Sequence, residues 1–463
     1  MSIERPGAAR PRPVGTLALR SLLLLAACLW WTRPVHAQQI DAAARASLAA
    51  ATSIGTAHAE FDSTVVTRDT ATTAKGQWPS QFLIHWNEYN LGFTTFLWGA
   101  GYLQDYASFS QDSFGRAHLE VEPQGRIRDS RFLVFGRLRT ERPITWQTGI
   151  MYDWAEWKWR VRLTLIAVDV PEISSKFQIG RVKEGLSLNK VLNGYDGWTS
   201  ERFTFSDAAI PLLTDGIKWM GYVPDKHVLW NLGVYTDWLS EREAFSSYAH
   251  QVVGRLVYLK MESDTAGTLW HAGAGLHIGK PEDDSLQLKS KPEVFESPNF
   301  IDTGKFPATL GTIAGVEIYH RDGPWTYGTE YYVVKARSTQ ANNPLFHGGD
   351  AFVSWIVTGE TRPYLAPNGT FGAISPARPV WKGGRGALEA VLRISYSDLD
   401  TDSLSGGKFW RVTPMVNWYL NDMARLEVSY GVGGLQRFGG HSTTEFFQAR
   451  LQLQFAKLSA ASD

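Results

Sequence analysis

The sequence predicts an all-β fold: a transmembrane antiparallel β-barrel of about 16 strands, with short periplasmic turns and long outer loops. Three observations carry this prediction. Apolar and polar residues alternate from about Leu91 to Phe455, no stretch after the first 37 residues approaches 18 consecutive apolar residues, and 13% of the chain is aromatic, with 19 Trp and 43 Gly. A membrane barrel needs apolar side chains only at alternate positions and places aromatic girdles at both membrane interfaces, so it has this composition without an apolar helix.

Residues 1–37 are predicted to be a signal peptide that export removes. Four arginines precede the apolar run Ser21–Trp31, which is shorter than the ~20 residues that a membrane-spanning helix needs. Residues 35–37 (Val-His-Ala) then have the small-x-small pattern that signal peptidase reads, so we expect the mature chain to begin at Gln38.

A lipoprotein signal is the alternative. Residues 25–28 (Leu-Ala-Ala-Cys) also fit the lipoprotein pattern, in which Cys28 would be acylated. The apolar run continues through Trp31, whereas a lipoprotein turns polar after its cysteine, and this favours cleavage after Ala37. Cleavage there removes five arginines, one glutamate and the only cysteine, which leaves 41 basic and 45 acidic residues, a net charge of −4. A mature chain without cysteine cannot be stabilised by disulfides.

The remaining chain divides into three parts. Residues 38–80 are rich in Ala and Thr and nearly free of aromatic residues, and we expect a short periplasmic lead-in. Residues 81–455 are expected to form the barrel, and residues 456–463 a C-terminal tail.

The closing segment, residues 447–455, shows the alternation most clearly. Its odd positions are Phe, Ala, Leu, Leu and Phe, and its even positions are Gln, Arg, Gln and Gln. Successive side chains of a strand point to opposite faces, so this strand has one apolar and one polar face. In a soluble β-sandwich, the alternative, the apolar faces would form a core; in a barrel they face lipid and the polar faces line the lumen. The aromatic Phe455 at the end of this strand favours the barrel.

The connections are of two kinds. Asn421-Asp422 forms a two-residue hairpin turn of the Asn/Asp type, whereas residues 280–306 and 360–384 are long and irregular. We expect the tight turns at the periplasmic side and the long loops outside. The span from Leu91 to Phe455 accommodates 16 to 18 strands of about 10 residues, and a barrel of this size leaves an aqueous channel.

No catalytic or cofactor motif is found. The chain has no His-Glu-x-x-His, no Gly-x-Ser-x-Gly and no phosphate-binding loop, so we expect neither an enzyme, nor a cofactor, nor a metal site, nor nucleic-acid binding. His271 and His277 share one face of a predicted strand, but six residues span about 20 Å, too far to share a metal ion.

Basic residues are concentrated on predicted inward faces. Arg137 and Arg139 share one face of a strand, Lys158, Arg160 and Arg162 form a ladder opposite the apolar face of Trp157, Trp159, Val161 and Leu163, and Arg181 and Lys183 form a third pair. A charge facing lipid near the midplane costs a few kcal/mol, so these side chains should point into the lumen. A lumen lined by Arg and Lys selects anions. The alternative is that the arginines pair with acidic residues across the lumen and stabilise the wall.

Several blocks resemble the phosphate-selective porin O and P family, over roughly residues 90 to 455 and most strongly from 347 on. These blocks are residues 177–188 (FQIGRVKEGLSL) followed by Glu201-Arg202, residues 352–360 (FVSWIVTGE) with Arg362 and Tyr364, residues 386–400 (GALEAVLRISYSDLD), residues 416–421 (VNWYLN) and residues 447–455 (FQARLQLQF). The chain departs from the family's usual pattern at Gly185, where a proline is usual, and at Arg181, where glutamine is usual.

The resemblance implies a 16-stranded barrel in the bacterial outer membrane, a homotrimer, and passive uptake of small anions, with phosphate or polyphosphate as the solute. It adds Arg393, which lies in the 386–400 block, to the candidate anion-binding residues Arg137, Arg139, Lys158, Arg160, Arg162, Arg181 and Lys183. Two alternatives stay open: a less selective channel for oligosaccharides or organic acids, and a structural surface barrel without conductance.

Overall fold

The computed structural model describes residues 88–91, 94–138, 140–142, 144–154, 156–238 and 248–455. The predicted signal peptide, the lead-in 38–80, the tail 456–463 and the candidate Arg139 lie outside the described residues. No helix of the described residues is long and apolar enough to cross a membrane.

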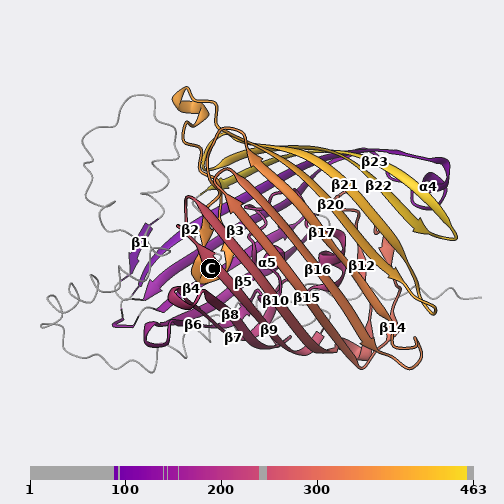
Figure 1. The fold of residues 1–463 in the computed structure, drawn as a ribbon, viewed down its shortest axis with the longest axis horizontal. Coiled ribbons are helices and arrows are strands. Elements are labelled where there is room, and N and C mark those ends of the chain that lie inside the picture. The colour runs from indigo at the N-terminus through magenta and orange to yellow at the C-terminus, as the bar shows by residue number, and fades with distance from the viewer. Residues whose placement is uncertain are drawn as a thin grey trace, which may run out of the picture. The chain divides into compact units, whose positions relative to one another are not determined.

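Sixteen antiparallel strands form a closed barrel, because each pairs with the next and the last, β23, pairs with the first, β2 (Figure 1). The strands are β2 (Thr94–Gln111), β3 (Gln124–Leu138), β4 (Ile144–Asp153), β5 (Lys158–Val170), β6 (Ser175–Val182), β7 (Thr214–Val223), β8 (Val228–Thr236), β9 (Tyr248–Met261), β10 (Thr268–Pro281), β15 (Leu310–Asp322), β16 (Trp325–Arg337), β17 (Leu345–Ile356), β20 (Ala387–Asp400), β21 (Ser405–Tyr419), β22 (Ala424–Arg437) and β23 (Gly440–Phe455). The predicted fold class is confirmed.

A short strand completes the seam between the first and last strands. Phe455, the last residue of β23, lies opposite Ala100, so β23 leaves the beginning of β2 without a partner on that side. Strand β1 (Glu88–Leu91) pairs with residues 94–97 of β2 there. Closed pairing of this kind leaves few unpaired backbone groups in a membrane barrel.

Burial along β16 alternates in the sense expected of a membrane barrel. On β16 the outward Trp325, Tyr327 and Tyr331 are 37%, 45% and 45% exposed, whereas the inward Glu330 and Tyr332 are almost fully buried. Three aromatic side chains are therefore outside, whereas the carboxylate of Glu330 is inside, which is the reverse of a soluble sandwich. This confirms the lipid-facing interpretation of the apolar faces.

One long connection lies at an unexpected end. Chain direction places six tight connections at the end that also carries Thr94 and Phe455, here named the turn end: 139–143, 171–174, 224–227, 262–267, 323–324 and 420–423. Other tight connections, including 401–404 and 438–439, lie at the opposite end. The long connections 183–213 and 282–309 lie at the opposite end, the loop end. Residues 357–386 were expected among the outer loops, but β17 runs toward the turn end, so this long connection lies with the tight turns. The expectation rested on the length of this segment, whereas the end of the barrel at which a connection lies follows from the direction of the strand before it.

Most of the remaining secondary structure lies in three long connections. Residues 183–213 are named the crossing loop, residues 282–309 the loop-end segment, and residues 357–386 the turn-end segment. Their elements, with the helix of the first loop, are α4 (Ser113–His118), α5 (Leu188–Val191), α6 (Thr204–Ala209), β11 (Ser285–Leu286), β12 (Lys289–Ser290), β13 (Ile301–Asp302), β14 (Phe306–Pro307), β18 (Tyr364–Leu365) and β19 (Thr370–Phe371). Single 3-10 turns are η3 (Pro171–Ile173), η4 (Pro224–Lys226), η5 (Glu282–Asp284), η6 (Ala366–Asn368) and η7 (Val380–Lys382).

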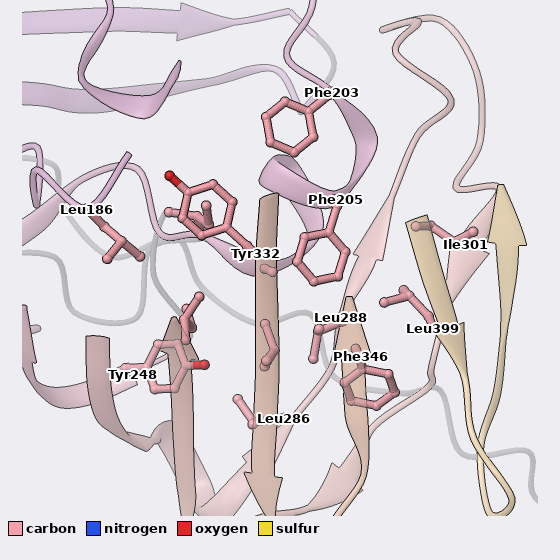
Figure 2. Close-up of a cluster of buried hydrophobic side chains, with 14 of the residues drawn as sticks. Leu186, Phe203, Phe205, Tyr248, Leu286, Leu288, Ile301, Tyr332, Phe346 and Leu399 are labelled. Atoms are coloured by element: carbon pink, nitrogen blue, oxygen red, sulfur yellow. The ribbon is translucent and has the colours of Figure 1, made fainter. Parts of the chain in front are cut away.

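These connections fill the barrel rather than leaving it hollow. Phe203 and Phe205 of the crossing loop belong to one buried apolar cluster with Leu288 of the loop-end segment and with Tyr332 and Phe346 of the wall (Figure 2). A barrel of this size is otherwise wide enough for an aqueous channel. The loops therefore restrict the interior, and the polar side chains that remain between them define the candidate site.

Candidate functional site

The crossing loop is held against a distant part of the wall. It leaves the barrel at Val182 of β6, and the hydroxyl of Ser187 and the backbone N–H of Asn189 donate to Glu330 of β16 at 2.6 and 2.7 Å. The N–H of Leu188 donates to Glu317 of β15 at 2.8 Å. Six strand-to-strand steps separate β6 from β16 around the barrel, so the loop spans the interior. Carboxylates that accept N–H groups at the start of α5 satisfy donors that a helix cannot satisfy itself.

A small cavity lies beside this loop, and arginines dominate its lining. Its volume is about 50 Å³, and we name it the arginine cavity after the five arginines that line it: Arg128, Arg131, Arg202, Arg393 and Arg450. Glu201 and Asp350 are the acidic residues of the lining. A space of this size holds a few water molecules or a small ion, because one water needs roughly 10–15 Å³ measured in this way.

Glu201 connects the cavity's two sides. Its carboxylate accepts from Arg128 Nε at 2.9 Å and from Arg450 Nη2 at 2.6 Å. Burial alone would raise the pKa of Glu201, but the guanidinium groups of Arg128 and Arg450 hold it well below its usual range. The group therefore stays ionised, and it positions both arginines.

Other carboxylates pair with the arginines from behind the lining. Arg131 binds Asp129 at 2.6 Å, and Arg450 binds Asp105 at 2.6 Å. Arg393 forms a short ion pair with Glu293. These pairs agree in part with the alternative stated above, in which the arginines pair with acidic residues across the lumen and stabilise the wall.

Several N–H donors at the cavity nevertheless have no acceptor among the described residues. They are Arg131 Nε, Asn193 Nδ2, Trp198 Nε1 and Arg393 Nε, all buried atoms of lining residues. Buried donors are nearly always satisfied, and each exception calls for an explanation such as an ion or a water. Two of these four donors are on arginines, and the group suits an anion, which accepts hydrogen bonds and carries the charge complementary to arginine.

A β-bulge brings Arg162 close to this group. Residues 162 and 163 of β5 both oppose Gly149, because the register of β4 and β5 shifts between Thr148 and Ile150. Arg162 lies near enough to Arg131 and Arg202 for their charges to repel one another. The bulge also corrects one prediction: unbroken alternation places Leu163 on the lipid face, but Leu163 is 8% exposed and belongs to the interior cluster. A bulge inserts one residue and changes the face of those that follow.

The other candidates lie in three different places. Arg137 is exposed near the turn end of β3. Lys158 and Arg160 lie at the loop end of β5, where Lys158 pairs with Glu156 at 2.8 Å and Arg160 with Asp153 at 3.1 Å. Arg181 and Lys183 are buried at the base of the crossing loop, with Arg181 3.8 Å from Asp215 and Lys183 Nζ donating to Val191 O at 2.5 Å. Of the seven candidates that the structure describes, Arg393 alone lines the arginine cavity, and Arg162 adjoins it.

Sequence reasoning did not select four of the cavity's arginines. Arg128 and Arg131 lie within the arginine-rich stretch 116–142, and Arg202 follows Glu201 in one of the family-like blocks, so signals existed for them. Arg450 alternates with apolar residues in the closing strand, which shows its face but not its partners. Its contacts with residues 105 and 201 join segments that are far apart along the chain.

The stability of the folded barrel should depend on pH through Glu184, at the start of the crossing loop. Burial raises the pKa of its carboxyl group from 4.5 to about 8, although contacts with Thr214, Gln251 and Lys190 lower it. Between these two pH values the folded protein keeps a proton that the unfolded chain has released, so this group makes the folded barrel less stable as pH rises from about 5 to 8, by at most about 1.4 kcal/mol per pH unit. Glu184→Gln should remove this part of the pH dependence, measured as the heat-modification midpoint on gels at pH 5 and pH 8. An unchanged pH dependence would show that the carboxyl is ionised throughout.

Among the described residues, no group of three or more His, Cys, Asp and Glu side chains is arranged to hold a metal ion. The side chains that give the arginine cavity its chemistry are its arginines and the amide and indole donors of the crossing loop.

Comparison with known proteins identifies the family. The sequence model of the phosphate-selective porin O and P family matches residues 207–455, which is more than half of the chain. The chain belongs to this family. The match begins inside α6 of the crossing loop and ends at Phe455, so this outer-membrane porin shares with its family the strands from β7 onward.

Individual proteins and structures resemble this porin at 30% sequence identity or below. An uncharacterized protein of Caulobacter vibrioides is 30% identical over 183 residues, 39% of this chain and 36% of that relative, so the chain spans well under two thirds of its length. The OmpT structure of Vibrio cholerae is 14% identical with a TM-score of 0.49 and covers 79% of this chain and 99% of that one. The structure of an anion-selective porin from Comamonas acidovorans is 10% identical with a TM-score of 0.48 and covers 78% and 100%.

Proposed function

We propose that this porin conducts small anions, with phosphate as the solute that its lumen fits best, and that conduction passes the arginine cavity. The observation that carries the proposal is the set of four buried N–H donors that have no acceptor among the described residues, on side chains that line a cavity with five arginines. Arginine presents a planar fork of donors that matches phosphate oxygens. The field inside a narrow, low-dielectric passage follows the local charge and not the net charge of the chain.

The dimensions of the cavity weigh against the oligosaccharide alternative. About 50 Å³ accommodates a small ion with little water, whereas a sugar would require the crossing loop to move away from Glu317 and Glu330. A structural barrel without conductance stays the second alternative, and the current measurement below separates it from the porin.

Reversal potential under a salt gradient tests the proposal. Arg131→Gln together with Arg202→Gln removes two charges from the lining, and we expect wild-type anion preference to fall or reverse and the block of chloride current by phosphate to weaken. Lys158→Gln is the matched control, because Lys158 lies half-exposed at the loop end and pairs with Glu156. Unchanged selectivity in the double variant would mean that ions do not pass this cavity, and absence of current in the wild type would favour the structural barrel.

The proposal includes maturation and assembly. We propose that export removes residues 1–37 and that the barrel forms a homotrimer in the outer membrane, as family membership suggests. N-terminal sequencing of the outer-membrane form should begin at Gln38. Recovery of a lipid-modified chain that begins at Cys28 would contradict this. Native mass spectrometry should give three copies per complex.

A further inference from the structure

A row of basic side chains crosses the outer face of the barrel at the loop end. His250 of β9 lies opposite Lys280 of β10, and Leu310 of the next strand, β15, lies opposite Arg337 of β16. The pairing of Gly279 with Gly311 aligns Lys280 with Leu310, so these four residues lie in one cross-strand row. Lys335 lies two residues below Arg337, and Lys335 is opposite Thr312. The basic residues of this outer basic row (His250, Lys280, Lys335 and Arg337) are all exposed.

The row lies directly above the apolar band. Val252 and Ile278 lie two residues nearer the turn end than His250 and Lys280, and their side chains are 58% and 42% exposed. Val333 lies two residues nearer the turn end than Lys335 and is 36% exposed. Charges at the membrane midplane would cost a few kcal/mol each, whereas they cost little near the interface. Lys280 has a carboxylate nearby, Asp284 at 3.4 Å, with both side chains more than half exposed. Lys335 and Arg337 form no ion pair with the part of the chain that the structure describes.

An apolar groove lies below the row on the same face. Its volume is about 720 Å³, and its lining includes Trp230, Leu232, Gly254, Leu256, Ala274 and Leu276. Gly254 and Leu276 lie opposite each other, each four residues from His250 and Lys280 respectively, or about 13 Å along the strand. Small residues form the floor, and Leu232, Leu256 and Leu276, which are 44%, 61% and 47% exposed, form the sides.

We propose that this face binds a phosphorylated glycolipid of the leaflet at the loop end, the outer leaflet for an outer-membrane barrel. Its phosphate groups bind the outer basic row, and one of its acyl chains occupies the groove. The row supplies charges complementary to phosphate, with the guanidinium fork of Arg337 and the ammonium groups of Lys280 and Lys335. The distance between row and groove matches an amphiphile whose charged head lies at the interface and whose chain lies deeper.

A second copy of the chain is the competing occupant of this face, because the homotrimer proposed above would join two different faces of the outer wall. The lipid-facing wall of another copy offers mostly apolar side chains to the basic row. A lipid brings the opposite charge to the row and hydrocarbon to the groove. The site is on the outer wall, so the inference does not depend on which solute passes the lumen.

Native mass spectrometry of the folded, full-length porin in detergent tests the proposal, with bis-phosphorylated lipid A as the probe. We expect the wild type to retain lipid A at least tenfold better than its dephosphorylated form. Lys335→Gln with Arg337→Gln should lower binding of the phosphorylated lipid about tenfold, and Ala274→Leu should lower binding of both forms by filling the groove. Lys260→Gln is the control, because Lys260 is an exposed residue of β9 near the turn end.

Heat modification on gels shows that each variant is folded before its lipid binding is compared. Equal binding of lipid A by the wild type and the double variant would overturn the proposal, as would equal loss in Lys260→Gln. A change in oligomeric state in Ala274→Leu, with lipid binding unchanged, would assign the groove to a second copy instead. Inorganic phosphate that displaces lipid A only in the wild type would support the assigned head-group site.

Discussion

Glu293→Ala is expected to destabilise the folded barrel by about 3–5 kcal/mol, because it leaves the buried Arg393 without its carboxylate. The carboxylate of Glu293 also accepts from the hydroxyl of Ser395 and from the N–H and hydroxyl of Thr204, at 3.2 and 3.3 Å. One side chain of the loop-end segment thus joins the wall to the crossing loop. The variant should lose its heat-modified shift at a lower temperature, and its single-channel current should become noisier as the crossing loop loses this contact.

An exposed ion pair supplies the control for Glu293. Arg142 and Glu172 pair at 3.0 Å at the turn end, with 46% and 63% of their side chains exposed. Glu172→Ala should leave the heat-modification temperature almost unchanged, because exposed pairs contribute little. The double variant Glu293→Gln with Arg393→Gln removes both charges and should recover most of the lost stability. An unaltered transition in Glu293→Ala would show that water replaces the carboxylate at Arg393.

Arg362→Ala is expected to increase single-channel conductance while anion preference is retained. Arg362 of the turn-end segment donates to both oxygens of Glu389 at 2.9 and 3.0 Å and to the backbone oxygen of Asp196 in the crossing loop at 2.6 Å. Its guanidinium also lies 4.9 Å from the ring centre of Trp198, a residue of the arginine cavity. Loss of these contacts should release the turn-end segment and widen the lumen, and it should cost about 3–5 kcal/mol because Glu389 is buried.

Arg378 is the matched control in the same segment. It is exposed, so Arg378→Ala should change neither conductance nor the temperature of heat modification. A conductance that is unaltered in Arg362→Ala would contradict the inference that the turn-end segment restricts the lumen. A gain in conductance with loss of anion preference would show instead that Arg362 contributes charge to the conducting path.

The alternation of the closing strands was sufficient to predict the barrel. The 447–455 pattern places Arg450 inside and Phe447 outside, as observed, since a strand in lipid admits few exceptions. The same logic failed at Leu163, because a bulge depends on the pairing of β4 with β5 and not on the sequence of β5 alone.

The site could be predicted only in part, for a different reason. Periodicity gives the face of Arg162 or Arg393, but the partners of such residues come from loops whose path is set by tertiary contacts. Glu201, which holds Arg128 and Arg450, comes from the crossing loop, and no strand pattern places that loop inside the barrel. The turn-end segment was misplaced because its side follows from counting every preceding strand.

The ion pair between Asp105 and Arg450 lies across the seam where the barrel closes, and it has a consequence for folding. Asp105 is on the first barrel strand and Arg450 on the last, 345 residues apart, and they are register partners in the final pairing. Contacts of such separation form late, because the intervening chain must lose its freedom first. Glu201 joins the same pair. An assembly intermediate with an open seam therefore lacks this ion pair, and the arginine cavity that Arg450 lines is complete only after the step that seals the barrel.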